Sequence, residues 1–464
     1  MMAKLLSRVM SAVMVILLAN HLLPASFGIY VLAMAMAYLA SVSMDFGFDE
    51  MAVREVSRRP EQTAGMISTI LFSRLLLSIL NFSALALAYL LFVPWMETTL
   101  SLAVLFIAGV MLSMERLIGT FESIFQAHQR MDVQGMTELL GRGTYLVMGY
   151  WGILMGYDLE RILLLMLVSY AVHFGISLVA YILTIGAGFV KPDLSRIPPI
   201  LKKTLPFTYF VLLAVFYGHI IVILLTLMEG DHATGVYSAG WKIIVFMGVV
   251  PYSFGRALYP VFSRMYQRGA EELGRAYDRS MKYMLMAGMP VTVLLYLMSE
   301  DMLSLIYRAE FADTVPIFRT LVWMVPFLFM NGSLKIVLWS SDRTKEASLN
   351  LLISVIALVF FSLLFIPIYG VAGAATAVVG AEMVHFLLNY HRVSGFLDPL
   401  PLAHLWKPFV ATLAMGAVFA LLVSRELGMI PLLGTALLTY PVALYLLKGL
   451  DRRDLEMFTE MVKR

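Results

Sequence analysis

Long apolar runs recur along the whole chain, and the clearest cover residues 9–44, 75–96, 162–190, 204–228 and 347–381. A bilayer core about 30 Å thick needs roughly 20 apolar residues per helix, so each run predicts at least one membrane-spanning helix. The first and last runs are too long for one crossing, and turn signals interrupt them at 23–28 and 366–370. Together with shorter apolar runs between them, this pattern predicts about fourteen spanning helices.

The composition supports a membrane protein. Of the 464 residues 60% are hydrophobic and only 14% are charged, whereas a soluble domain has about 25% charged residues. The absence of cysteine excludes disulfides, thiolate catalysis and Cys-ligated metal centres. Basic residues do not cluster into one face, so no nucleic-acid partner is expected. We therefore expect an all-α polytopic membrane protein.

Lysine and arginine concentrate in alternate loops between the predicted helices. The loop residues that carry this bias include Arg54, Arg58, Arg59, Arg130, Arg142, Lys191, Lys202, Lys203, Arg264, Arg268, Arg275, Arg343 and Lys345. The intervening turns are short and nearly free of them. Because positively charged loops stay on the cytoplasmic side, both termini are predicted to be cytoplasmic and the number of spans even.

The chain resembles itself when it is shifted by 207 residues. This shift superimposes Ile16–Leu18 on Ile223–Leu225 and Gly28–Tyr30 on Gly235–Tyr237. We interpret the pattern as two pseudo-symmetric six-helix bundles, an arrangement typical of transporters. The predicted organisation is a first bundle at 1–190, a cytoplasmic linker at 191–203, a second bundle at 204–392, a helix pair at 404–450 and a cytoplasmic tail at 451–464.

A few charged residues fall inside the predicted spans, where a charge normally faces a cavity or a partner. Arg74 and Lys242 each lie about eight residues into a helix, or about 12 Å deep, which is too far for easy snorkelling to the interface. Arg8 and Arg256 lie nearer helix ends and could snorkel, and Lys335 could form an ion pair. All five are basic and are predicted to contact the substrate, since a basic cavity suits a phosphate.

Acidic residues suggest a second kind of site. Asp45 and Glu50 follow the second predicted helix beside Arg54, which indicates either an interfacial salt-bridge cluster or a gate. Glu382 lies within a span and is the fourth candidate for gating or ion coupling. No residue pattern predicts a catalytic centre, a metal site or a cofactor.

Several stretches resemble a known family. They are Leu23–Tyr30, Asp45–Phe48, Gly235–Lys242 and Ile366–Ala375, which resemble segments of the polysaccharide-unit and O-antigen flippases in the multidrug/oligosaccharidyl-lipid/polysaccharide (MOP) exporter superfamily. The resemblance implies two six-helix bundles around a central cavity. Similarity to the lipid II flippase branch implies cavity positions for Arg8 and Lys242. Met14 stands where that branch has a second arginine, which favours another polyprenyl-linked glycan over lipid II.

These observations favour a flippase that moves a polyprenyl-(pyro)phosphate-linked oligosaccharide across the cytoplasmic membrane of a prokaryote by alternating access. The coupling ion would be H⁺ or Na⁺, and a monomer is expected. One alternative is a cation-coupled multidrug or small-molecule antiporter of the same superfamily, which would need acidic residues at cavity depth. A membrane glycosyltransferase or polymerase would need large outer loops, which are absent here, so we do not expect an enzyme.

Overall fold

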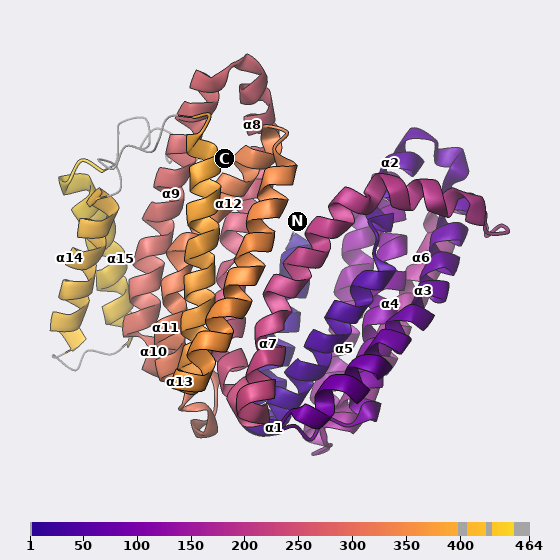
Figure 1. Ribbon diagram of the computed structural model, residues 1–464, viewed down its shortest axis with the longest axis horizontal. Helices are drawn as coiled ribbons and strands as arrows, with labels where there is room; N and C mark the ends of the chain where they lie inside the picture. Colours follow the sequence, from indigo (N-terminus) through magenta and orange to yellow (C-terminus); the bar gives the residue numbers. More distant parts are fainter. Residues whose placement is uncertain (1, 398–405, 424–428, 450–464) are drawn as a thin grey trace. The chain divides into compact units, whose positions relative to one another are not determined.

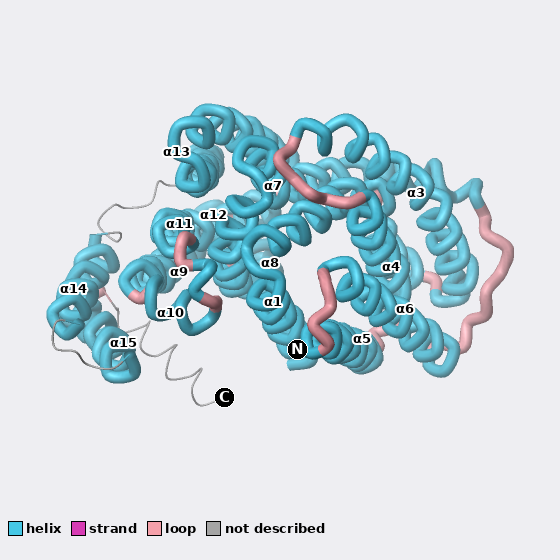
Figure 2. The backbone as a smooth tube through the Cα atoms, turned by 90° about the horizontal axis from the view of Figure 1, so that it is seen from below, coloured by secondary structure: helices cyan, strands magenta, loops and turns pink. Residues whose placement is uncertain are grey.

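The computed structural model describes residues 2–397, 406–423 and 429–449. Its regular elements are helices, and none of the described residues forms a strand (Figures 1 and 2). This confirms the all-α class. The α-helices are α1 (Met2–Ser41), α2 (Phe48–Arg58), α3 (Thr63–Phe92), α4 (Leu102–Ala127), α5 (Met131–Leu154), α6 (Leu159–Thr184), α7 (Ile197–Met247), α8 (Val249–Arg268), α9 (Ala270–Leu297), α10 (Ser299–Ile306), α11 (Thr314–Leu321), α12 (Val325–Ser340), α13 (Thr344–Ser394), α14 (Trp406–Val423) and α15 (Met429–Leu446).

Three of these helices contain an internal break. The backbone leaves the helical region at Leu23 in α1, at Gly230 in α7 and at Gly370 in α13. Two breaks fall inside the turn signals predicted at 23–28 and 366–370. Among the described residues, nine helical segments are long and apolar enough to cross a membrane. Since some of these segments contain a break, nine is not the number of crossings, and the count of fourteen stays a prediction.

The chain forms two compact units. The first contains Met1–Ala239, Ile306–Asp313 and Ser362–Ala374, and the second contains Gly240–Leu305, Thr314–Phe361 and Ala375–Arg464. Helices α7 and α13 therefore contribute to both units. The predicted bundle boundaries at 190 and 204 stay a prediction, as does the linker between them.

The core of the first unit is built on the short amphipathic helix α2. Its buried residues Phe48, Met51, Ala52 and Val56 recur at helical spacing and form one apolar face. This face packs in a cluster with residues of α3, α4 and α6, among them Phe121. The packing holds the acidic start of α2 close to α3 and α4, where the candidate site lies.

The second unit has a core made by α8, α9, α12 and α13, which includes Phe262, Tyr277 and Leu334. Helices α14 and α15 pack on α9 through a separate apolar cluster. The hydroxyl of Tyr440 in α15 also donates a hydrogen bond to the Met286 carbonyl of α9 at 2.8 Å. These two helices correspond to the predicted pair at 404–450, whereas the predicted tail at 451–464 lies outside the described residues.

Candidate functional site

Arg74 lies at the centre of a charged cluster in the first unit. Its side chain is 0% exposed, and its guanidinium is 3.0 Å from the Asp49 carboxylate and 3.9 Å from the Asp45 carboxylate. Asp49 belongs to the first turn of α2, where the positive end of the helix dipole also stabilises its carboxylate. The cation that the sequence analysis placed deep in a span is therefore neutralised by two nearby carboxylates.

Two other nitrogens of Arg74 donate hydrogen bonds. Nε donates to the Met44 carbonyl at 3.3 Å, and Nη1 donates to the Thr120 hydroxyl at 2.6 Å and to the Arg116 carbonyl. The Phe48 ring lies 5.9 Å from the guanidinium carbon. Such extensive pairing indicates that Arg74 holds α3, α4 and the start of α2 together. Its predicted contact with the substrate stays a prediction.

Asp45 links this cluster to a second arginine. Its carboxylate is 2.8 Å from the Arg116 guanidinium, which also donates to the Ser41 hydroxyl at 3.4 Å. Asp45 therefore interacts with both Arg74 and Arg116, which lie on different helices. Movement of the turn that carries Asp45 away from α3 or α4 would break one of these contacts, and the gating role of Asp45 stays a prediction.

Two predicted gate residues lie on the exposed surface of α2. Both Glu50 and Arg54 are exposed. Partial removal from water, followed by repulsion from Asp45 and Asp49, raises the pKa of Glu50 above its ordinary value. The gating role of these residues is not tested by this arrangement.

A polar cavity of about 260 Å³ lies beside the cluster. It is lined by residues of α1, α2, α4, α5 and α6: Tyr38, Ser41, Asp49, Leu112, Glu115, Arg116, Ile118, Gly119, Glu122, Glu138, Arg142, Tyr170 and His173. The lining contains four carboxylates but only two guanidinium groups. None of the five predicted substrate contacts lines this cavity, so it is not the basic cavity expected from the sequence.

Arg142 is the residue that the sequence analysis misplaced. It was counted among the loop cations, but it lies inside α5 and is 2.8 Å from the Glu115 carboxylate of α4. Arg142 also donates to the Tyr170 hydroxyl of α6 at 3.3 Å. It therefore connects three helices around the cavity. The sequence feature that could have indicated this role is Glu115, an isolated carboxylate in the preceding span.

His173 packs tightly against α5 on one wall of the same cavity. A Cβ added at Gly141 would overlap the His173 ring, so the glycine allows the two helices to approach closely. The His173 side chain is buried, and its Nε2 has no hydrogen-bond partner within the described residues. A search of the described residues finds no group of three or more His, Cys, Asp or Glu side chains arranged to hold a metal ion.

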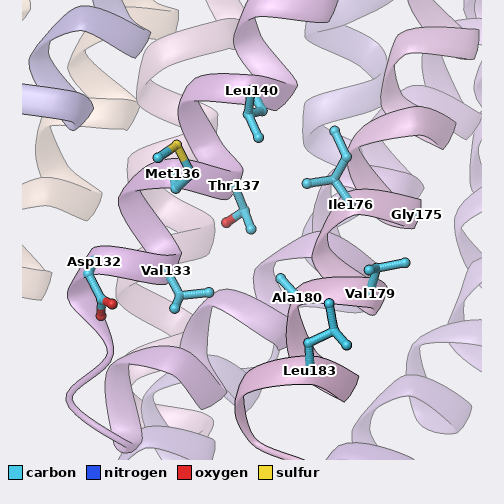
Figure 3. Close-up of a pocket in the computed structure, with 10 residues that line it drawn as sticks. All are labelled: Asp132, Val133, Met136, Thr137, Leu140, Gly175, Ile176, Val179, Ala180 and Leu183. Atoms are coloured by element: carbon cyan, nitrogen blue, oxygen red, sulfur yellow. The ribbon is translucent and has the colours of Figure 1, made fainter.

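A separate apolar groove of about 710 Å³ lies between α5 and α6. Figure 3 shows the residues that line it, which come from the two facing helices. Apart from Asp132 and Thr137, they are apolar or glycine. Because the groove offers no cation, it lacks the chemistry expected for a phosphate and is not the candidate substrate site.

The predicted basic contacts in the second unit are less enclosed. Lys242 in α7 and Arg256 in α8 are exposed, and the Arg256 guanidinium lies 5.7 Å from the Tyr252 ring centre. Lys335 in α12 is half-buried, with its ammonium 5.2 Å from the Trp339 ring centre. Within the described part of the chain, no hydrogen bond or ion pair to Lys242 is observed. In the first unit, Arg8 of α1 is exposed.

Glu382 heads a chain of buried polar side chains in the second unit. Asn331 donates to the Glu382 carboxylate at 2.7 Å, Asn389 donates to Asn331 at 3.1 Å, and Asn350 donates to Asn389 at 2.9 Å. All four side chains are buried. Lys335 also interacts electrostatically with Glu382. This chain was not visible in the sequence, because its members are separated by up to 58 positions.

Comparisons with known proteins agree with this architecture. A family model described as "Polysaccharide biosynthesis protein" matches residues 1–266, and the MatE model matches residues 206–359. A search of curated proteins finds no match.

Several solved structures share the fold. One is the lipid II flippase MurJ in an inward closed conformation, with a TM-score of 0.77, 15% identity and coverage of 98% of each chain. Another is an inward-facing multidrug resistance MATE family transporter of the MOP superfamily, with a TM-score of 0.70, 18% identity and coverage of 84% of this chain and 95% of that one. A MOP superfamily transporter from Pyrococcus furiosus has a TM-score of 0.57, 17% identity and coverage of 85% and 93%.

The chain therefore has the fold of this flippase and of these transporters, and nine of its described helical segments are long and apolar enough to cross a membrane. The polysaccharide biosynthesis model covers more than half of the sequence. The chain therefore belongs to the polysaccharide biosynthesis protein family.

Proposed function

We propose that this transporter is a flippase for a polyprenyl-(pyro)phosphate-linked oligosaccharide in the cytoplasmic membrane of a prokaryote. The family supports a role in polysaccharide biosynthesis. Under this proposal both termini are cytoplasmic, the protein acts as a monomer, and H⁺ or Na⁺ drives alternating access.

The observation that carries the proposal is the environment of Lys242. A lysine in an apolar helix is costly in lipid and normally faces a cavity or a ligand. Lys242 is exposed, and no counter-charge to it is observed in the described residues. Its ammonium could hold a phosphate as a point charge, with Arg256, Lys335 and Arg8 as further contacts.

The test combines a transport assay with substitutions of Lys242. Proteoliposomes would carry a polyprenyl-pyrophosphate-linked oligosaccharide, and its arrival at the opposite leaflet would be followed by a membrane-impermeant glycosidase. We expect Lys242→Ala to reduce transport at least tenfold and Lys242→Arg to keep most of it. Arg264→Ala, which removes an exposed cation of α8, is the matched control. Full transport by Lys242→Ala would contradict this role.

A second candidate function is cation-coupled export of small molecules. The observation in its favour is the excess of carboxylates over guanidinium groups in the cavity of the first unit. Loss of the protein would then raise sensitivity to cationic drugs and leave the leaflet distribution of lipid-linked oligosaccharide unchanged. The flippase proposal instead requires unchanged sensitivity to cationic drugs and an altered leaflet distribution of the lipid-linked oligosaccharide.

A further inference from the structure

Two breaks in the helices occupy equivalent positions in the internal repeat. Leu23 in α1 has φ 64°, and Gly230 in α7 has φ 81°. They are separated by 207 positions, which is the shift that aligns the chain with itself. Positive φ is ordinary for glycine but rare for leucine, so the same turn is kept even where the residue type opposes it.

The segments after these breaks make reciprocal contacts inside the first unit. A Cβ added at Gly28 would overlap the carbonyl oxygen of Asp231, and a Cβ added at Gly235 would overlap the carbonyl oxygen of Pro24. Each contact becomes the other when 207 is added to or subtracted from the residue numbers. This exchange is the pattern that a two-fold axis between the segments produces.

Two polar side chains in the same region each form hydrogen bonds to the backbone of a distant part of the chain. Asp231 accepts a hydrogen bond from the Thr99 backbone N–H at 2.9 Å, which joins α7 to the loop before α4. Asn20 donates to the Ile306 carbonyl at 2.8 Å and accepts from the Arg308 N–H at 2.9 Å. Each predicted bundle thus supplies one side chain that binds a loop of the other bundle.

We propose that these contacts form a latch that closes the predicted outer side of the transporter, and that the latch opens once in each cycle. The latch comprises Asn20, Pro24, Gly28, Asp231 and Gly235. The inference rests on the alternating access in the proposed function, but it does not depend on which substrate is carried. Backbones in direct contact leave no space for a ligand, so passage to this side requires the segments to separate.

The chain lacks cysteine, so a single reporter can measure opening. Ala233 is 7% exposed and lies between two latch residues. The reporter variant Ala233→Cys would be labelled with a membrane-impermeant maleimide on intact cells and on inverted vesicles. We expect slow labelling from both sides, because the reporter position is covered while the latch is closed.

A larger side chain at Gly28 should wedge the latch open. We expect Gly28→Leu to speed labelling of the Ala233→Cys reporter from the outer side about tenfold, since labelling follows the open fraction. Gly218→Leu is the matched control, because a Cβ at Gly218 meets nothing within 4 Å. Equal labelling in the two variants would overturn the latch, and so would acceleration only in inverted vesicles.

The polar contacts provide an independent test if Gly28→Leu does not fold. Asn20→Ala and Asp231→Ala should each speed labelling severalfold, whereas Asp231→Asn keeps an acceptor oxygen for Thr99 and should change it little. Equal rates for Asp231→Ala and Asp231→Asn would contradict a role for this hydrogen bond. If labelling responds as expected but no lipid-linked oligosaccharide is moved, the proposed substrate fails and the latch stands.

Discussion

Arg74 offers the sharpest test of whether a charge in a spanning helix serves the fold or the substrate. Replacing it with leucine removes an ion pair of 3.0 Å to Asp49 and hydrogen bonds to Met44, Thr120 and Arg116. The side chain is completely buried, so water cannot replace these partners. We therefore expect Arg74→Leu to destabilise the protein.

The magnitude follows from what the substitution leaves behind. Removing one partner of a buried pair costs about 3–5 kcal/mol, because the other charge remains without compensation. Asp49 is 31% exposed, and Asp45 keeps its contact with Arg116 at 2.8 Å. Both facts reduce the penalty, so we expect the lower limit of about 3 kcal/mol.

The measurement is the free energy of unfolding in mixed micelles titrated with denaturing detergent. The double variant Arg74→Leu/Asp49→Leu removes both charges and should recover about 2 kcal/mol of the loss, as expected for directly coupled residues. Arg161→Leu is a suitable control, because its pair with Asp158 is 4.0 Å long and both side chains are 69% exposed. That surface pair should contribute less than about 1 kcal/mol.

One result would refute this reasoning about Arg74. If Arg74→Leu is as stable as the wild type but has lost transport, the guanidinium serves the substrate and its ion pairs contribute little to the fold. Loss of stability without recovery in the double variant would also contradict the assigned partner, since Asp49 would then not be the charge left uncompensated.

Two further predictions concern other residues of the first unit. Burial lowers the pKa of His128, so the folded state binds a proton less readily than the unfolded state, and the free energy of unfolding should fall as the pH drops below about 6.5. His128→Gln should flatten this part of the plot of unfolding free energy against pH. An unchanged slope would exclude His128 as the source of the pH dependence. Gly141→Ala should cost about 1–3 kcal/mol because its Cβ overlaps His173; His173→Ala should relieve the clash, and wild-type stability of Gly141→Ala alone would contradict the tight packing.

The sequence predicted best what short segments determine. Proline and glycine signals located the breaks in α1 and α13, because a turn depends on a few neighbouring residues. The shift of 207 also identified Gly28 and Gly235 as equivalents, and both make the same kind of close contact. The class of fold followed from the length and number of the apolar runs.

Ion pairs between residues far apart in the sequence could not be predicted from short segments. Asp45 was grouped with neighbouring residues of the sequence, whereas its partner Arg74 lies 29 positions further on and belongs to α3. Arg142 was assigned to a loop, whereas the structure places it inside α5. Its true partner, Glu115, becomes evident only when α4 and α5 are placed together.

The pairing separates the basic residues into two groups with different chemistry. Arg74, Arg116 and Arg142 each contact a carboxylate in the first unit, where the planar guanidinium can satisfy several acceptors at once. Lys242 is exposed in its helix, and a lysine ammonium binds phosphate as a compact charge. Neutralising a paired arginine should therefore affect folding first, whereas neutralising Lys242 should affect transport first. Comparing the two effects in each variant would show which cations belong to the framework and which serve the substrate.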